Sequence, residues 1–256
     1  MSQSLRFAAC QFPVTGEMDA NLAYILRYTH RAAGEGSNGV QFPEASLPGY
    51  ARLDFPSFSH FDWQKLPEHT ETIVALAEHL KIWIILGSCR QVSEKEKPRN
   101  CLHVISCSGN IIATYDKRKL YGKEATAYSK GHTPLTITIN GTKCGFLICY
   151  DSCFPRLYEL YRRQGVKLLF HSYYNAKNEG AGTSLDDLIL AQLRTGAADN
   201  QMWISASNSS ARHSRLAACI ARPDGSVVST RRHMSGIVTH SVPDSALGWT
   251  YDNRTE

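Results

Sequence analysis

The segment CGFLICYDSCFPRLYE, residues 144–159, joins an apolar run that ends at Cys149 to a polar stretch that follows it at once. A short continuous apolar run is typical of a buried β-strand, and the polar stretch after it has the character of a helix. The pattern therefore predicts a strand that ends at a cysteine just before a helix. Cys149 is then either a core residue at a boundary or a nucleophile presented at a strand end, and the segment leaves both open.

Outward from this segment, strand and helix patterns alternate along the chain. Apolar or alternating runs predict strands over 5–12, 39–44, 82–88, 101–107, 111–117, 135–139, 143–149, 166–172, 202–208 and 236–242. Helical patterns cover 18–33, begun by Asp19 or a neighbour, and 67–80, about 153–163 and 184–200.

Three turn signals interrupt this alternation. Asn140-Gly141 predicts a tight hairpin, and Ser-Gly-Asn at 108–110 and Pro-Asp-Gly at 223–225 predict two more. Helices and strands that alternate, with hairpins inserted, predict an α/β fold: a layered sandwich with a mixed sheet, not a purely parallel one. We expect a single domain over 1–256.

The composition is that of an ordinary globular protein. Of the 256 residues, 43% are hydrophobic and 20% are charged, which is enough to form a sizeable core. The longest apolar runs are too short to span a membrane, and no secretory signal is visible at the N-terminus. We therefore expect an enzyme-sized, cytoplasmic protein with no membrane partner.

The cysteines, histidines and charges exclude several classes of site. The eight cysteines contain no CxxC pair and the ten histidines show no spacing typical of a metal site, so we expect reduced, mostly buried thiols and no metal. The net charge is +5, with basic clusters at 211–215 and 231–233 but no nucleic-acid-binding motif. Solvated loops explain these clusters, and attraction of an anionic substrate is the alternative.

Three predicted strand ends carry residues that are capable of chemistry: Glu44, Lys117 and Cys149. Taken singly, each has a structural explanation: Glu44 as a solvated turn residue, Lys117 as part of a charged loop and Cys149 as a core cysteine. Together they form a coherent set, because a thiol needs a base and an attacked carbonyl needs donors for its oxygen. Glu44 can serve as the base, and His171 and His132 are alternatives that sequence spacing does not exclude.

The remaining parts of this chemistry are also visible in the sequence. Lys117 and the backbone N–H of Tyr150 can donate to the developing negative charge. The helix predicted just after Cys149 is expected to favour its thiolate form, since helix N-termini lower the pKa of cysteines.

Several segments resemble the nitrilase superfamily of carbon–nitrogen hydrolases. They are FPEASLPGY, YDKRKL and GFLICYDSCFP, followed by LRTGAADNQMWISASN (193–208) and ACIARPDGSVV (218–228), in the same order over essentially the whole chain. The resemblance implies a four-layer α-β-β-α sandwich that needs no cofactor. It also implies a homodimer or larger homo-oligomer that pairs through the helices at about 153–163 and 184–200.

The resemblance also assigns roles to residues. It implies that Glu44 is the general base, Cys149 the nucleophile and Lys117 the stabiliser of the tetrahedral intermediate, with Lys119 as the competing lysine. Glu124 most resembles the family's second glutamate, which supports the lysine and the substrate.

The chain departs from the family's pattern after the nucleophile. The family often has arginine where Cys153 stands and glutamate where Arg156 stands. An ion pair near the nucleophile is therefore missing, and a pair between Arg156 and Glu159 is a possible replacement.

The residues after the nucleophile suggest the reaction. Tyr150-Asp151 resembles the amidase and carbamoylase branches, whereas enzymes that hydrolyse nitriles usually carry Trp-Glu there. We expect hydrolysis of a small amide, an ω-amide or an N-carbamoyl compound, through a thioester and with release of ammonia. A non-catalytic scaffold protein and a thioester-dependent N-acyltransferase are the alternatives.

The substrate pocket is expected next to the cysteine strand. Tyr173, Tyr174 and Asn175 follow the neighbouring strand and are candidate pocket residues, although the tyrosines can also simply cover an apolar edge. A substrate carboxylate would need an arginine, for which Arg212 and Arg215 are candidates. A polyamine would need acids, and this stretch offers only Glu179.

Overall fold

A computed structural model describes residues 4–93, 95–175 and 184–243. Its strands form one mixed sheet in the order β5-β4-β3-β2-β1-β9-β8-β7-β6, with β12 paired to β1, β10 to β9 and β11 to β10. The bounds are β1 Leu5–Phe12, β2 Gly39–Gln41, β3 Trp83–Arg90, β4 Arg99–Ser106, β5 Asn110–Asp116, β6 Thr136–Ile139, β7 Thr142–Ile148, β8 Leu168–Ser172, β9 Trp203–Ser209, β10 Cys219–Ala221, β11 Val227–Ser229 and β12 Gly236–Val242.

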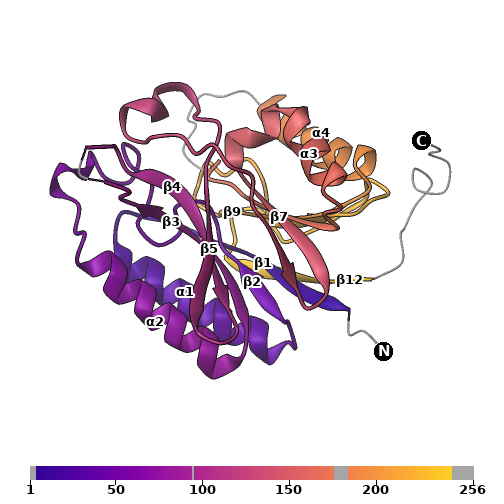
Figure 1. Ribbon diagram of the computed structural model, residues 1–256, viewed down its shortest axis with the longest axis horizontal. Helices are drawn as coiled ribbons and strands as arrows, with labels where there is room; N and C mark the ends of the chain where they lie inside the picture. The colour runs from indigo at the N-terminus through magenta and orange to yellow at the C-terminus, as the bar shows by residue number, and fades with distance from the viewer. Residues whose placement is uncertain (1–3, 94, 176–183, 244–256) are drawn as a thin grey trace.

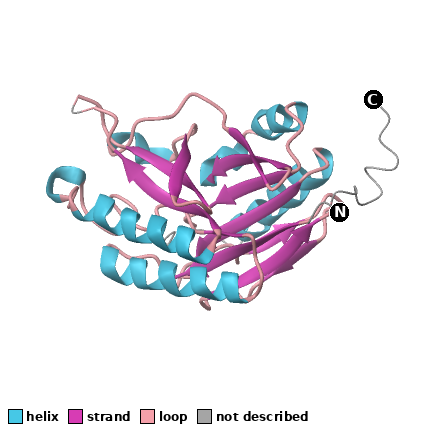
Figure 2. Cartoon of the chain, turned by 60° about the horizontal axis from the view of Figure 1, so that its bottom comes forward, coloured by secondary structure: helices cyan, strands magenta, loops and turns pink. Residues whose placement is uncertain are grey.

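Helices cover the outer faces of the two halves of this sheet. Helices α1 (Met18–Gly34) and α2 (Lys65–Leu80) lie on the half that contains β1 to β5, and α3 (Pro155–Arg163) and α4 (Ser184–Asp199) lie on the other half (Figures 1 and 2). Among the described residues, strand pairing links the two halves where Gln11 and Phe12 of β1 pair with Asn208 and Ser209 of β9. This arrangement confirms the α-β-β-α sandwich expected from the sequence.

Aliphatic and aromatic side chains fill the space between the two halves. The ring of Phe170 in β8 lies 4.4 Å from that of Phe7 in β1 and 5.6 Å from that of Phe146 in β7, measured between ring centroids. All three are buried. Burying such large apolar surfaces is the main force that holds the layers together.

Hydrogen bonds between side chains of β2, β8 and β9 also join the two halves. Gln41 at the end of β2 donates to Ser172 of β8 (3.1 Å) and accepts from Ser205 of β9 (2.6 Å). The hydroxyls of Ser172 and Ser207 both donate to the carbonyl of Phe42. These buried polar groups satisfy one another, and they fix the end of β2 against β8 and β9.

The predicted elements and the observed ones agree in type, with differences at their ends. Asn140 and Gly141 have positive φ angles of 46° and 83°, as the predicted hairpin turn requires. The strand predicted over 39–44 ends at Gln41. Helix α1 begins at Met18 after Glu17, and no side chain caps it, so Asp19 does not begin it.

The helix predicted over about 153–163 is present as α3, and a separate 3-10 helix precedes it. A 3-10 helix, η3 (Cys149–Cys153), comes first, and α3 starts at Pro155, a residue that favours the first turn of a helix. Two further 3-10 helices are η1 (Phe58–His60) and η2 (Gly122–Thr126). Among the described residues, no helix is both long enough and apolar enough to cross a membrane.

Candidate active site

Cys149 stands at the junction between β7 and η3, with its backbone in the left-handed region at φ 42°. This conformation is costly for a residue with a side chain and persists only where its surroundings enforce it. The buried carboxylate of Asp151 does so by accepting from the N–H of Ile148 (3.0 Å) and that of Lys119 (2.9 Å). The hydroxyl of Tyr115 donates to the same carboxylate at 2.8 Å. Asp151 thus ties the cysteine turn to the segment that carries Lys117.

The thiol of Cys149 faces Asn175, to whose side-chain oxygen it donates at 3.7 Å. Burial raises the pKa of this thiol well above its ordinary value, and the charge of Glu44 raises it further. Lys117 and a backbone hydrogen bond from Tyr174 act in the opposite direction but do not outweigh burial. Burial thus opposes the thiolate form that the sequence led us to expect, and the helix that begins at Cys149 is only the short η3.

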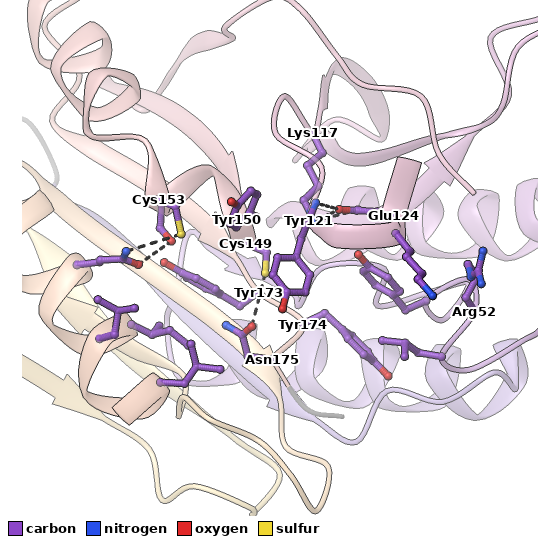
Figure 3. Close-up of a pocket in the computed structure, with 18 of the residues that line it drawn as sticks. Arg52, Lys117, Tyr121, Glu124, Cys149, Tyr150, Cys153, Tyr173, Tyr174 and Asn175 are labelled. Atoms are coloured by element: carbon purple, nitrogen blue, oxygen red, sulfur yellow. Dashed lines mark hydrogen bonds and ion pairs between the residues drawn. The ribbon is translucent and has the colours of Figure 1, made fainter. Parts of the chain in front are cut away.

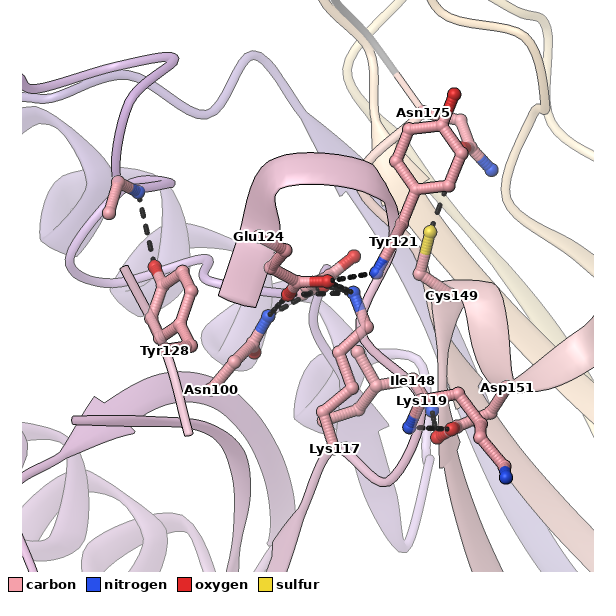
Figure 4. Close-up of polar contacts among 12 residues, drawn as sticks. Asn100, Lys117, Lys119, Tyr121, Glu124, Tyr128, Ile148, Cys149, Asp151 and Asn175 are labelled. Atoms are coloured by element: carbon pink, nitrogen blue, oxygen red, sulfur yellow. Dashed lines mark hydrogen bonds and ion pairs between the residues drawn. The ribbon is translucent and has the colours of Figure 1, made fainter. Parts of the chain in front are cut away.

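Lys117 lies directly after β5 and is almost completely buried. Its Nζ donates to Glu44 Oε1 at 2.7 Å and to Glu124 at 2.9 Å (Figure 4). Asn100 bridges the same two carboxylates, since its amide nitrogen lies 2.7 Å from Glu44 Oε1 and 3.2 Å from Glu124 Oε1. The sequence-predicted Glu44, Lys117 and Glu124 thus meet in one cluster.

The charges in this cluster are unbalanced. Burial raises the pKa of Glu44, and repulsion by Glu124 adds to this, while Lys117 and Asn100 oppose it. Burial disfavours the charged form of Lys117, yet the attraction of Glu44 and the other anions raises its pKa well above the ordinary value. We conclude that Lys117 stays protonated and that the carboxylates compete for this one cation.

Glu44 lies behind Lys117 and not on the wall of the cavity. It is fully buried in the turn after β2, and that turn packs closely on Gly87, where a Cβ atom would lie only 1.9 Å from the carbonyl oxygen of Pro43. Its Oε2 has no hydrogen-bond partner among the described residues. A buried acceptor without a partner is costly and calls for an explanation.

A cavity of about 460 Å³ opens over Cys149 and Lys117 (Figure 3). Its walls come from the segment after Gly49, from η2 and η3, from the end of β8 and from α4. The lining residues are Tyr50, Ala51, Arg52, Leu53, Lys117, Tyr121, Lys123, Glu124, Cys149, Tyr150, Ser152, Cys153, Tyr173, Tyr174, Asn175, Leu185, Leu188, Ile189 and Gln192. The wall includes all four of the pocket candidates from the sequence: Tyr150, Tyr173, Tyr174 and Asn175.

The hydroxyls of the two pocket tyrosines are engaged with the protein. The Tyr174 hydroxyl donates to Asp54 at 2.6 Å, and the Tyr173 hydroxyl lies 3.0 Å from Nδ1 of His171. These contacts fix the orientation of both rings in the wall of the cavity.

Several alternatives from the sequence lie elsewhere. The ammonium of Lys119 lies 4.4 Å from the centre of the Phe154 ring, and His132 is exposed. His171 is buried beside the backbone carbonyl of Cys149, with Nε2 at 3.2 Å, and burial lowers its pKa to about 3. It does not face the sulfur as a base would.

The two arginines that were expected to bind a substrate carboxylate do not line the cavity either. Arg215 pairs with Asp186 at 3.6 Å, and neither Arg212 nor Arg215 is among the described residues that line the cavity. The cations at its wall, besides Lys117, are Arg52 and Lys123. Glu179 lies outside the described residues.

The predicted replacement for the missing ion pair is wrong. Glu159 accepts from Arg163, which stands one helical turn later, at 2.5 Å. Cys153, which stands where the family often has arginine, is exposed and lines the cavity. Gln192 Nε2 donates to its sulfur at 3.7 Å.

Sequence reasoning missed Asn100, Asp151 and Arg52 as site residues. Asn100 is the second residue of a strand, and only its approach to two carboxylates distinguishes it. Asp151 was noted as part of a motif, without a role. No motif in the sequence identifies Arg52. It stands in an irregular segment, with a positive φ of 71°, and local sequence patterns do not predict where such a segment places a side chain.

Comparisons with known proteins agree with this geometry. The family model for carbon–nitrogen hydrolases matches residues 6–250. The omega-amidase NIT2 of Homo sapiens is 28% identical over 212 residues, which are 79% of this chain and 73% of that protein. The chloroplastic omega-amidase of Arabidopsis thaliana is 28% identical over 258 residues, 93% of this chain and 67% of that protein.

The solved structure of the NitN amidase from Nesterenkonia sp. AN1 has the same fold. It superposes with a TM-score of 0.82 at 20% identity, over 94% of this chain and 93% of that one. The resemblance to the nitrilase superfamily and the sandwich fold expected from the sequence are both confirmed. Because the family model spans nearly all of its length, the chain belongs to the carbon–nitrogen hydrolase family.

Proposed function

We propose that the protein is a cysteine-dependent amidase in which Cys149 is the nucleophile, Glu44 the general base and Lys117 the main donor to the oxyanion. One observation carries this proposal. A fully buried glutamate with an unpartnered oxygen shares one lysine with a second glutamate, next to a cysteine held at positive φ in the wall of a cavity. Folding alone gives no reason for this combination, which costs stability.

The first half-reaction forms a thioester. Glu44 takes the proton of the Cys149 thiol as the sulfur attacks the carbonyl carbon of the amide. The carbonyl π electrons move to oxygen, where the Lys117 ammonium and the backbone N–H of Tyr150 donate to the negative charge. When the oxyanion collapses, the C–N bond breaks, and Glu44 gives its proton to the nitrogen so that ammonia leaves.

The second half-reaction regenerates the enzyme. Water attacks the thioester carbon while Glu44 takes one of its protons. The C–S bond then breaks, and the proton returns to the sulfur as the carboxylic acid leaves. The raised pKa of the thiol suits this cycle, since the resting enzyme keeps a proton on sulfur until a substrate is in place.

Glu124 and Asn100 position the catalytic cluster. Glu124 accepts from the N–H of Tyr121 at 2.8 Å as well as from Lys117, so it joins the cluster to η2. Asn100 donates to Glu44 Oε1, which leaves Oε2 as the oxygen that accepts the proton. Both residues hold the base and the ammonium in fixed relative positions, as oxyanion stabilisation requires.

The substrate we propose is an ω-amide, a small acid with an amide at its far end. Two curated relatives are omega-amidases, and one solved neighbour carries the acetamide moiety of fluoroacetamide on its active-site cysteine. In Figure 3, Arg52 and Cys153 lie toward opposite ends of the lining residues, with Cys149 and Tyr121 between them. Arg52 and Lys123 can bind a carboxylate that extends away from Cys149.

Ammonia release from four matched compounds tests this function. Succinamate and butyramide differ in the terminal carboxylate, while N-carbamoyl-β-alanine and butyronitrile represent the carbamoyl and nitrile classes. We expect turnover of succinamate, which Cys149→Ala abolishes. Cys107→Ala, a half-buried cysteine in the turn after β4, is the matched control and keeps wild-type activity.

The other outcomes point to different functions. Preference for N-carbamoyl-β-alanine would replace the ω-amide by a carbamoyl substrate. Hydroxamate formation from hydroxylamine without hydrolysis would indicate an acyltransferase. If all four compounds bind, as measured by calorimetry, and none is turned over, the chain is a scaffold protein and the proposal is wrong.

We also propose that the protein forms a homodimer through α3 and α4. On α4, Leu190 is 37% exposed and lies outside the residues that line the cavity, and an exposed apolar side chain on a helix favours contact with another surface. Light scattering of the wild type and of Leu190→Lys checks this, because a charge at that contact should produce a monomer.

A further inference from the structure

His171 is a buried histidine whose contacts the mechanism above does not use. It lies in β8 and is completely buried. Its Nε2 lies 3.2 Å from the carbonyl oxygen of Cys149, and its Nδ1 lies 3.2 Å from the Tyr158 hydroxyl and 3.0 Å from the Tyr173 hydroxyl. The Tyr173 ring stacks on the imidazole, with centroids 4.1 Å apart.

These contacts settle which ring nitrogen carries the proton. A carbonyl oxygen only accepts hydrogen bonds, so Nε2 must donate to Cys149. Burial and the charge of Lys117 lower the pKa of His171 to about 3, so the imidazole is neutral and Nδ1 is left as an acceptor with one lone pair beside the two tyrosine hydroxyls. His171 is therefore a fixed donor that points at one backbone atom of the nucleophile.

That backbone atom belongs to the peptide between Cys149 and Tyr150. All described peptide bonds are trans, and in a trans peptide the C=O and the N–H point in opposite directions. The carbonyl of Cys149 points to His171 in the core, so the N–H of Tyr150 points away from it. Cys149 and Tyr150 both line the cavity, whereas His171 is completely buried and is not among the lining residues.

We infer that His171 is a positioning residue that holds this peptide so that the N–H of Tyr150 faces the oxygen of the tetrahedral intermediate. The inference rests on the proposed amidase function. At φ 42°, Cys149 lies outside the conformations that its side chain favours, so the orientation of the next peptide needs an external partner. The hydrogen bond from His171 is that partner, and the two tyrosines in turn fix the imidazole.

Two substitutions of similar polarity separate this role from a merely structural one. In His171→Gln, the amide nitrogen can take the place of Nε2 and donate to Cys149. In His171→Asn, the shorter side chain ends near the position of Nδ1 and does not reach that carbonyl. The matched control is His103→Gln, which replaces a histidine in β4 that also has a lowered pKa and whose Nδ1 lies 2.9 Å from the Thr114 hydroxyl.

Two readouts are measured for each variant. The first is kcat and KM for succinamate, a reaction that builds an oxyanion. The second is alkylation of Cys149 by iodoacetamide, followed by mass spectrometry of its peptide. Alkylation displaces iodide from a methylene carbon and forms no oxyanion, so it reports on the thiol and not on the N–H of Tyr150.

We expect His171→Asn to lower kcat by about 10²-fold, the usual effect of losing one oxyanion donor, with KM and the alkylation rate within about threefold of wild type. His171→Gln should recover at least a tenth of the wild-type kcat, and His103→Gln should leave kcat unchanged. If alkylation falls as far as kcat in His171→Asn, or if both His171 variants retain full activity, the inference is wrong. A wild type that hydrolyses no amide contradicts the proposed function instead.

Discussion

Lys117 Nζ lies 2.7 Å from Glu44 Oε1 and 2.9 Å from Glu124, so one buried ammonium serves two buried carboxylates. With both carboxylates ionised, the cluster carries an excess negative charge among almost completely buried side chains. Such an arrangement raises the cost of ionising Glu44, and this makes Glu44 a better acceptor for the proton of Cys149 than an ordinary carboxylate.

Neutralising Glu124 should extend activity to lower pH. Burial and then the charge of Glu124 raise the pKa of Glu44, so Glu124→Gln removes one cause and lowers that pKa. Glu44 acts as a base only when ionised, and the acid limb of kcat/KM therefore moves to lower pH. The pH profile for succinamate checks this, with exposed Glu96→Gln as control. An acid limb that stays in place or moves upward contradicts the assignment of Glu44 as the base.

Adding a carboxylate should have the opposite effect. Asn100 donates to both Glu44 and Glu124, and Asn100→Asp replaces that donor with a third negative charge. Like charges at this distance disfavour ionisation, so the pKa of Glu44 rises and the acid limb moves to higher pH. Asn100→Leu removes the hydrogen bonds without adding charge and is the matched comparison. Equal acid limbs in these two variants would contradict the electrostatic explanation.

Asp151 should be important for stability as well as activity. Its carboxylate accepts from Ile148, Lys119 and Tyr115, so Asp151→Ala removes the acceptor of two buried donors and one partly buried donor. We expect the free energy of unfolding to fall by about 2–5 kcal/mol, against about 1 kcal/mol for Tyr115→Phe, which removes one of these bonds. Urea denaturation measures both. Equal losses in the two variants would show that Asp151 does not hold the turn.

The charge at the mouth of the cavity should set substrate preference. Arg52 is exposed and lines the cavity, where its guanidinium donates to the Thr126 hydroxyl. We expect Arg52→Gln to lower kcat/KM for succinamate about tenfold, since a partly exposed charged hydrogen bond contributes roughly 1–2 kcal/mol. Turnover of butyramide, which has no carboxylate, should stay the same.

A control and a salt titration complete this test. Arg27→Gln changes an exposed arginine on α1, outside the residues that line the cavity, and should affect neither substrate. Added salt should reduce the advantage of succinamate over butyramide in the wild type, because salt screens exposed charges. If Arg52→Gln weakens turnover of both substrates equally, Arg52 does not recognise the carboxylate.

Local sequence patterns were sufficient to predict the framework of the fold. The apolar run that ends at Cys149, the Asn140-Gly141 turn and the helical spacing of 184–200 each act within a few residues, through burial, backbone conformation and amphipathicity. For the same reason, the strand ends that carry Lys117 and Cys149 were predictable.

Contacts between distant segments were decided only by the tertiary structure. Glu44 meets Asn100 across 56 positions and Lys117 across 73, and no local pattern encodes which carboxylate oxygen remains without a partner. Likewise, the sequence identified His171 as a candidate base, but the packing of β8 against η3 directs its Nε2 to a backbone carbonyl. Sequence spacing identifies which side chains are capable of chemistry, whereas burial, charge and direction arise only when the sheet brings distant strand ends together.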